Sequence, residues 1–498
     1  MSDKNINNLS LNSLFTIFFT ISIIFNLAPP SAFAEPLLSI EKNEAVGLFR
    51  FVSGLCGAGQ TSKMNIAAYA EMYENKDEDK DKVHVENFKK IFEELPKSFD
   101  LFPDRELPPS RKFKSYTELL YYYAAAARDL RQFEFSIYAM MPFDYADKLV
   151  ACLQHFKPIY QKIHCKPTDR LLDDYLKRTR NSDFIKQLQR FYGADSKCPE
   201  IKVIIVPVYI SKKLYDKYNK SMSACSVNYG NLQIIEVLFT GDKFKDPYDV
   251  IVHELCHFYY DLSSEIEKTV KKLTGSNSIN GKFCARIINE ALATSIGNGY
   301  FGATDLNTNW YEDEAIDKYA KSLFPCVKKY MDSNITINEK FNEEILNIFN
   351  KTFIDAQNNL SFLLYDIHVI SDAISTRNIF KEINSFFYCN GYQSSGTIDS
   401  PKMLENFKRH KDYTTVFVTN RAGLNSLKAY KLEGVETLIK DKFTGPAVYF
   451  NYDKIQKCNY LIFICKTVDE LKALLNKLSA ARIIQPSKLI SINSGLKK

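Results

Sequence analysis

The pentapeptide His253–His257, which reads His-Glu-Leu-Cys-His, places the strongest constraint on how this chain can fold. Residues four positions apart lie about 40° apart around an α-helix, because the helix has about 3.6 residues per turn. His253 and His257 can therefore bind one metal ion if this segment is helical. Glu254 lies on the flank of the same face, where its carboxylate can reach a water molecule on the metal. The pattern predicts a helix that carries two metal ligands and a base.

Residues on both sides of the pentapeptide also favour a helix. Asp246 and Pro247 precede it, and an N-capping residue followed by proline in the first turn is typical of a helix start. Apolar residues then supply a side that can be buried, namely Val250, Ile251, Val252, Leu255 and Phe258. The alternative interpretation is a helix whose two histidines are only packed or solvated.

A second predicted helix, from about residue 282 to 296, offers a third metal ligand. A catalytic zinc site takes three protein ligands and keeps a fourth position for water. Glu290 is the natural third ligand, and Asn289 beside it can support a ligand through a hydrogen bond. The small residues Ala293 and Thr294 would let this helix approach the first one closely.

Other assignments of the third ligand stay open. Asp261 and Glu265 follow the pentapeptide closely and compete for the same role. Glu290 could instead be a surface residue of an amphipathic helix. Residues 297–299, which read Gly-Asn-Gly, are predicted to end the helix that carries it.

With this spacing the chain resembles the gluzincins, zinc peptidases in which HExxH is completed by a glutamate on a following helix. The extension typical of metzincins is absent, because Tyr260 and Ser263 stand where that class has glycine and histidine. The resemblance implies a Zn²⁺ ion bound by His253, His257 and Glu290. The resemblance covers the catalytic core best and the rest of the chain less.

The resemblance also implies a fold around the metal site. Two β-like segments, 202–208 and 232–239, precede the motif helix. In zincins such strands form a small sheet whose edge strand lines the substrate cleft, and a peptide can add to that edge. Pro207 suits an edge or a strand end. The order of helical region, turn at 229–231, β-segment and HExxH is similar to a bacterial family of secreted, uncharacterised peptidase-like proteins.

The chemistry that the resemblance implies assigns further roles. Glu254 would act as general base towards a zinc-activated water. Gluzincins commonly add a tyrosine or histidine that stabilises the oxyanion. Tyr300 and His368 are the first choices for this role, and Tyr311 and His410 are the other downstream candidates.

The N-terminus indicates export. Residues 14–28 form a nearly continuous apolar run, and Ala-Phe-Ala at 32–34 is typical of a signal-peptidase site, so residues 1–34 are predicted to be a signal peptide. An uncleaved membrane anchor is the alternative. The mature protein is expected to be secreted or periplasmic in a bacterium, without stable membrane insertion.

The chain contains eleven cysteines, an odd number, so at least one thiol is free or pairs between chains. Cys256, inside the pentapeptide, is the expected odd one and should pack as a small apolar residue. Cys284 lies on the predicted ligand helix, where a structural pairing is open.

With 498 residues the chain is long enough for two or three domains. After the signal peptide we predict a helical N-terminal region (35–198), a zincin-like metallopeptidase core (199–372) and a small α/β region of unknown role (373–498). The predicted fold class is α+β, with a small mixed sheet in a mainly helical core. Predicted helices outside the motif include 44–57, 85–94, 115–141 and 341–364. β-like or helical segments of the last region include 414–419, 424–432, 447–452 and 461–465, and a capping box at 467–470 opens a helix.

The charge and motifs leave two function classes. The formal charge of +6 comes from 65 basic and 59 acidic residues without a long basic tract, so no nucleic-acid partner is expected. The first hypothesis is a secreted zinc peptidase acting on peptides or proteins. It is expected to be an endopeptidase, since no GxMEN-like motif precedes His253. The alternative is a catalytically inactive, zinc-stabilised binding protein on a zincin fold. The oligomeric state is not indicated.

Overall fold

The computed structural model describes residues 38–59, 61–73, 78–95, 116–179, 184–194, 201–218, 224–229, 231–241, 243–275, 279–411 and 413–492. The predicted signal peptide lies outside these ranges. The chain divides into two compact units, 1–254 and 255–498, and the division falls inside helix α11 (Tyr248–Leu262). The described residues form many helices and two mixed sheets, so the predicted α+β class is confirmed.

The first unit contains a five-stranded sheet whose main strand order is β1-β2-β4-β3. Strands β1, β2 and β4 are mutually parallel, and β3 forms an antiparallel pair with β4. The strands are β1 (Leu38–Glu41), β2 (Ile201–Tyr209), β3 (Ala224–Tyr229), β4 (Leu232–Thr240) and the short β5 (Lys243–Phe244), which also pairs with β4. Both predicted β-segments are therefore strands, but they are the two central ones. The edge strand next to β4 is β3, which the sequence pattern did not predict.

Pro207 lies in the part of β2 that pairs with β4 but not with β1. β1 covers β2 from Ile201 to Ile204, and β4 pairs with β2 as far as Tyr209. A proline has no backbone N–H to donate, so it is tolerated where one side of the strand lacks a partner. Pro207 was predicted to suit an edge or a strand end, but β2 is a central strand, and the proline is tolerated there because β1 does not extend to it.

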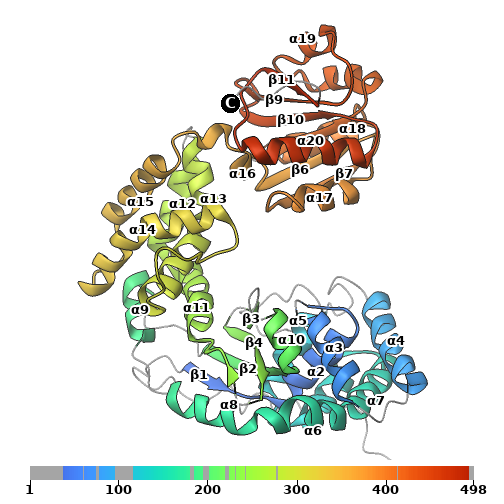
Figure 1. The fold of residues 1–498 in the computed structure, drawn as a ribbon, viewed down its shortest axis with the longest axis vertical. Helices are drawn as coiled ribbons and strands as arrows, with labels where there is room; N and C mark the ends of the chain where they lie inside the picture. Colours follow the sequence, from blue (N-terminus) through green and yellow to red (C-terminus); the bar gives the residue numbers. More distant parts are fainter. Residues whose placement is uncertain are drawn as a thin grey trace, which may run out of the picture. The chain divides into compact units, whose positions relative to one another are not determined.

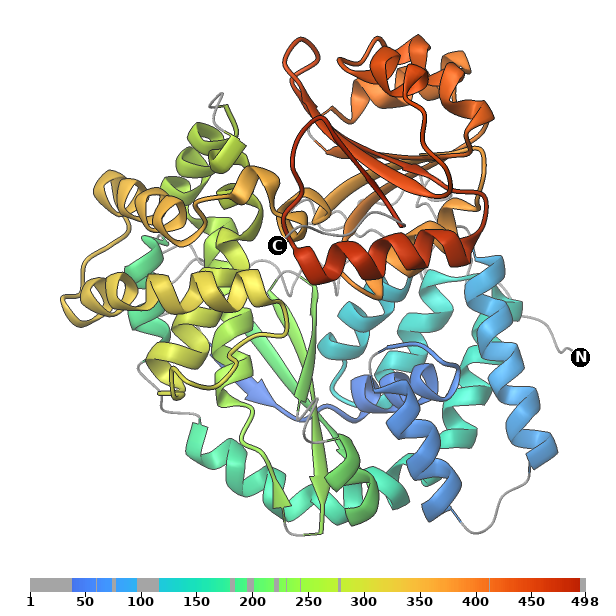
Figure 2. The same cartoon turned by 45° about the horizontal axis from the view of Figure 1, so that its top comes forward.

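Helices surround this sheet and share one hydrophobic core with it. The predicted helix at 115–141 is two helices, because Asp129 caps the second one by accepting a hydrogen bond from the Gln132 N–H at 2.9 Å. Figure 2 shows the blue and cyan helices of this unit beside the green strands. The helical segments are α2 (Glu44–Leu55), α3 (Ser62–Met72), α4 (Glu78–Glu94), α5 (Tyr116–Ala126), α6 (Leu130–Met140), α7 (Phe143–Tyr160), the π-helix η2 (Gln161–Cys165), α8 (Lys166–Thr179), α9 (Phe184–Tyr192) and α10 (Lys212–Tyr218).

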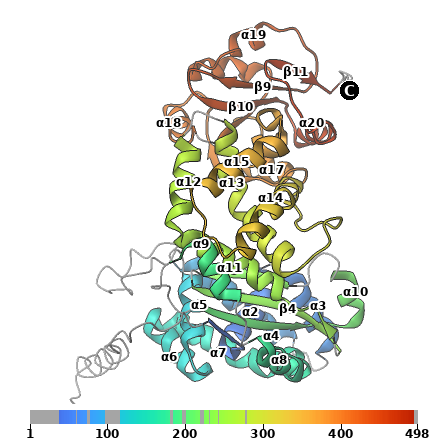
Figure 3. The same cartoon turned by 90° about the vertical axis from the view of Figure 1, so that its left-hand side faces the viewer.

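The second unit begins with a helical layer in which α13, α14 and α15 pack against one another (Figure 3). The helix that carries Glu290 does not end at residues 297–299 as predicted, but continues as the π-helix η3. Gly299 is needed there because a Cβ atom would lie 2.8 Å from Trp310 and Phe324. The predicted helix at 341–364 is also shorter. The segments are α12 (Ser264–Gly275), α13 (Ile279–Thr294), η3 (Ser295–Phe301), α14 (Glu314–Asp332), α15 (Glu339–Thr352), the 3₁₀-helix η4 (Ala356–Asn358) and α16 (Leu360–Leu363).

A six-stranded sheet completes the second unit, with strand order β11-β9-β10-β8-β6-β7 (Figure 1). Strands β7, β6, β8 and β10 are parallel, while β9 runs antiparallel to β10 and β11. Helices α17 and α20 lie side by side, and α18, η5 and α19 share a hydrophobic cluster with the sheet. The segments are β6 (Asp366–Ser371), α17 (Thr376–Asn384), β7 (Asn390–Ser395), α18 (Pro401–Arg409), β8 (Thr414–Thr419), the 3₁₀-helix η5 (Ala422–Tyr430), α19 (Val435–Lys440), β9 (Ala447–Asp453), β10 (Cys458–Ile464), α20 (Val468–Ala481) and β11 (Lys488–Ser491).

The predicted α/β character of the C-terminal region is confirmed, with changes in detail. β6 begins at Asp366 and lies between β7 and β8, so this sheet includes residues before the predicted boundary at 373. The segment 424–432 lies mostly in η5. The predicted capping box opens α20, where Thr467 accepts a hydrogen bond from the Glu470 N–H. The division of the chain inside α11 matches neither of the predicted boundaries, at 198 and at 372.

Nine cysteines in the described part of the chain lie outside disulfide bonds, and seven of them are buried. Cys256 is fully buried in α11 and packs as predicted. Across the described ranges, the helices lack the combined length and hydropathy needed to cross a bilayer.

Candidate metal centre

Helix α11 forms where the sequence predicts it. The Tyr248 N–H donates to the Asp246 carboxylate at 2.9 Å, so Asp246 caps the helix start, and the Ile251 N–H donates to the Pro247 carbonyl at 2.9 Å. Ile251, Val252, Leu255 and Cys256 are completely buried on the inner side. His253, Glu254 and His257 are only half-buried. Burial of the apolar face therefore fixes which way the motif face points.

Helix α13 brings Glu290 to the two histidines. One ligand atom from each of His253, His257 and Glu290 lies within 4.8 Å of the others. His257 Nε2 lies 3.5 Å from Glu290 Oε1. Ala293 and Thr294 are completely buried one turn further along. The structure brings together the three predicted ligands.

The imidazole of His257 is oriented by Asn289. Its Nδ1 lies 2.9 Å from the Asn289 side-chain oxygen, so Nδ1–H donates this hydrogen bond. The lone pair of the neutral ring is then on Nε2, the atom that faces Glu290. This is the support that metal-binding histidines usually receive from a neighbouring oxygen. The predicted role of Asn289 is consistent with this contact.

The donor set fits a divalent metal ion. Two imidazole nitrogens and one carboxylate oxygen suit zinc and other first-row divalent metals, and three protein ligands leave a position for water. Within the described residues, this is the one group of histidine, cysteine or carboxylate side chains arranged to hold a metal ion. Asp261 and Glu265 are not members, and Glu265 instead contacts Lys268 at 2.6 Å. The geometry does not select the metal.

Glu254 contacts the edge strand of the first sheet. Its carboxylate accepts a hydrogen bond from the Ser226 hydroxyl, and Ser226 lies in the middle of β3. Strand β3 pairs with β4 on one side. The edge strand is therefore attached to the motif helix at the carboxylate that is predicted to be the base. No signal in the sequence marked Ser226, because β3 itself was not predicted.

Tyr300 and His368 have hydrogen-bond partners outside the ligand group. The Tyr300 hydroxyl donates to Asp332 at 3.0 Å on the exposed side of α14. His368 is fully buried in β6, with its Nε2 2.8 Å from the Ser394 hydroxyl. Burial lowers the pKa of His368 to about 4, and neighbouring His410 acts in the same direction. The role of each as the oxyanion donor stays a prediction.

Tyr311, a lower-ranked candidate, contacts one of the three candidate ligands. Its hydroxyl is hydrogen-bonded to Glu290, and burial together with the Glu290 charge raises the pKa of Tyr311 above its ordinary value. Because a tyrosine hydroxyl donates to a carboxylate, this contact can hold Glu290 in place. The sequence alone could not show which of the 30 tyrosines contacts Glu290.

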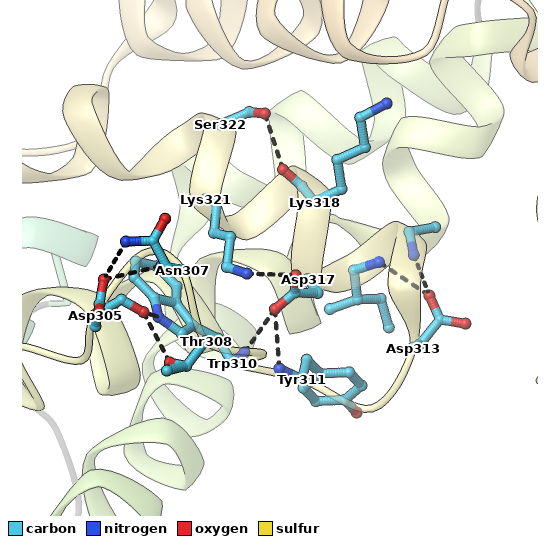
Figure 4. A network of polar contacts seen from close by, with 12 residues as sticks. Asp305, Asn307, Thr308, Trp310, Tyr311, Asp313, Asp317, Lys318, Lys321 and Ser322 are labelled. Atoms are coloured by element: carbon cyan, nitrogen blue, oxygen red, sulfur yellow. Dashed lines mark hydrogen bonds and ion pairs between the residues drawn. The ribbon is translucent and has the colours of Figure 1, made fainter.

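The loop that carries Tyr311 is held by a polar network at the start of α14 (Figure 4). The backbone N–H groups of Trp310 and Tyr311 donate to Asp317 at 2.6 and 3.2 Å. Lys321 donates to the other oxygen of Asp317 at 2.7 Å. The Trp310 indole N–H donates to the Asp305 carbonyl at 3.0 Å. These hydrogen bonds fix the backbone at Tyr311 and beside it.

The chain was compared with known proteins, and no family model, curated protein or solved structure matches it.

Proposed function

We propose that this chain is a zinc-dependent peptidase of the gluzincin type and that it acts as an endopeptidase. The observation that carries the proposal is the group of His253, His257 and Glu290 with Glu254 beside it on α11. A Zn²⁺ ion held by these three ligands would acidify a water molecule and polarise a peptide carbonyl. This chemistry needs a base at the position that Glu254 occupies.

Each residue of the site, and each residue that contacts it, then has a distinct role. Glu254 accepts a proton from the attacking water and delivers it to the leaving amine. Ser226 orients Glu254 through its hydrogen bond. Asn289 holds His257, and Tyr311 holds Glu290, so both ligands face the same point.

The substrate is proposed to be a peptide in extended conformation. β3 is an antiparallel edge strand, and main-chain groups of an edge strand can pair with a peptide. Because Ser226 joins this strand to Glu254, a peptide paired with β3 would lie close to the base. Export through the predicted signal peptide, to the periplasm or the medium of a bacterium, belongs to the same proposal.

The test uses residues 35–498 loaded with zinc and incubated with a diverse peptide mixture, with cleavage read by mass spectrometry and metal content measured separately. We expect one zinc per chain and internal cleavage that a chelator abolishes. Glu254→Gln should keep the metal and lose cleavage by at least about a hundredfold, the usual contribution of a general base. Glu267→Gln is the matched control, since Glu267 is exposed and pairs with Lys271.

Two results would reject the proposal. The first is cleavage that persists in Glu254→Gln. The second is one bound metal per chain without any cleavage, which would favour the zinc-stabilised binding protein instead. Removal of single residues from a peptide end would keep the peptidase and reject the endopeptidase assignment.

A further inference from the structure

Three tyrosines of the second unit gather next to Glu290. Tyr311 is hydrogen-bonded to Glu290 and lies near Tyr365 and Tyr388. Tyr365 in turn lies near Tyr388 and Glu290. The rings of Tyr365 and Tyr388 pack with centroids 5.4 Å apart and a tilt of 40°. We call Tyr311, Tyr365 and Tyr388 the tyrosine cluster.

The tyrosine cluster is built from segments that are distant in the sequence. Tyr311 comes from the loop before α14, Tyr365 directly precedes β6, and Tyr388 lies between α17 and β7. An ion pair beside it joins the ligand helix to the C-terminal sheet, since Arg286 Nε lies 3.3 Å from Asp366. Both side chains are mostly buried there. The C-terminal α/β region therefore contributes side chains to the surroundings of the metal ligand.

The cluster has a closed side and an open side. Tyr365 is only 9% exposed, whereas Tyr388 is 50% exposed. The Tyr388 ring thus rests on a buried aromatic neighbour and presents much of its own surface to solvent. Aromatic rings prefer offset or edge-to-face contacts with a further ring, so this arrangement suits a third aromatic partner.

The charges around the cluster favour an uncharged partner over a cationic one. Glu290, Asp313 and Asp366 are the carboxylates that act on Tyr365. Asp366 is paired with Arg286, and Asp313 accepts hydrogen bonds from two backbone N–H groups at the start of α14. Glu290 is hydrogen-bonded to Tyr311 and is a proposed metal ligand. Each carboxylate therefore already has a partner that offsets its charge.

We propose that the tyrosine cluster is a substrate subsite that binds an aromatic side chain of the peptide beside Glu290. This inference rests on the proposed peptidase function and names the class of peptide that the site prefers. It also assigns a role to the C-terminal region, which supplies Tyr365 and Tyr388. Tyr388 provides the open ring surface, while Tyr365 and Tyr311 support it.

The test measures binding without turnover. The zinc-loaded Glu254→Gln chain is titrated by calorimetry with three peptides of one sequence that carry Phe, Ala or Lys at a single scanned position. At one position the Phe peptide is expected to bind about tenfold more tightly than the Ala and Lys peptides. Tyr388→Ala should remove this difference. Tyr138→Ala, which alters a partly exposed tyrosine of α6, should preserve it.

The outcomes separate the two proposals. Equal affinities for the three peptides at every position, or a preference for Lys, would overturn the subsite even if the unaltered chain cleaves peptides. A Phe preference that survives Tyr388→Ala would also overturn it. A Phe preference that Tyr388→Ala abolishes would support the subsite even if the unaltered chain cleaves nothing, a result that rejects only the proposed peptidase.

Discussion

His257 illustrates how a single neighbouring side chain prepares a metal ligand. Asn289 accepts its Nδ1–H, which leaves the Nε2 lone pair directed at Glu290. We expect Asn289→Ala to weaken zinc affinity by about 10- to 100-fold, as the loss of such a partner usually does. Competition with a chromogenic chelator measures this affinity. Asn280→Ala is the control, because Asn280 lies at the start of the same helix and bonds Asn350. Equal affinities in both variants would contradict the assignment.

Tyr311 and Tyr300 form a matched pair of tyrosines with different partners. Tyr311→Phe removes the hydroxyl that bonds Glu290, and we expect about a tenfold loss of zinc affinity. Tyr300→Phe removes the hydrogen bond to Asp332 and should leave zinc affinity unchanged. The same chelator competition applies. A loss seen in Tyr300→Phe alone would restore Tyr300 as the tyrosine of the site.

His164 makes the stability of the first unit sensitive to acid. It is fully buried, its Nδ1 accepts the Tyr209 N–H at 2.9 Å, and burial lowers its pKa to about 3. The unfolded chain, with a histidine pKa of about 6.5, binds the proton more readily, so His164 lowers the free energy of unfolding as the pH falls below that value.

Between pH 6.5 and 4.5 the contribution of His164 amounts to about 2 to 3 kcal/mol, at about 1.4 kcal/mol per pH unit. His164→Gln keeps an oxygen acceptor for Tyr209 but cannot be protonated. Urea unfolding at several pH values should show a shallower loss of stability for this variant below pH 6.5. Parallel curves for the two proteins would show that His164 is not the group responsible.

At the scale of elements, β3 links the sheet to the motif helix through Ser226. Ser226→Ala should leave zinc content unchanged and lower kcat for peptide cleavage by about tenfold, because Glu254 loses the donor that orients it. Ser136→Ala in α6 is the control, since the Ser136 hydroxyl donates only to a carbonyl of its own helix. Unchanged kcat in Ser226→Ala would show that Glu254 is oriented by other contacts.

Several elements could not be predicted because their local sequence is ambiguous. β3 is short and mixes polar and apolar residues, and it is a strand because β4 pairs with it along its whole length. Gly297 and Gly299 form a pattern that is typical of a helix end, so the helix was predicted to stop there. The helix nevertheless continues into η3, where Gly299 allows the rings of Trp310 and Phe324 to approach closely. The conformation of β3 depends on pairing with the next strand, β4, and that of η3 on rings from residues 310 and 324.

At the scale of the whole chain, a buried ion pair joins residues 186 positions apart. Arg50 of α2 contacts Glu236 of β4, and their side chains are 7% and 1% exposed. The Thr61 hydroxyl also donates to Glu236, at 2.6 Å. Removing one partner leaves an uncompensated buried charge, which costs several kcal/mol.

We therefore expect Glu236→Ala to lower the free energy of unfolding by about 3 to 5 kcal/mol. The exposed pair of Glu267 and Lys271 is the comparison, and Glu267→Ala should cost less than about 1 kcal/mol. Combining Arg50→Met with Glu236→Leu should restore most of the stability, because no charge is then left unpaired. Urea unfolding measures all three. A cost below about 1 kcal/mol for Glu236→Ala would show that water or other groups solvate Arg50.

The sequence by itself determined the motif helix, the three ligand candidates and Asn289 as a residue that could support a ligand, while the structure identified His257 as its partner. These depend on helical periodicity and on capping residues, which act over a few positions. It also determined the α+β class and five of the eleven described strands, β2, β4, β8, β9 and β10, since runs of apolar residues mark buried strands. Only the tertiary structure decided that β3 is the edge strand, that Tyr311 rather than Tyr300 contacts Glu290, and that Tyr365 and Tyr388 lie nearby. The tyrosine contacts join segments far apart in the chain, and the edge position of β3 depends on which strands assemble beside it. Both are decided by how whole elements pack rather than by any local pattern.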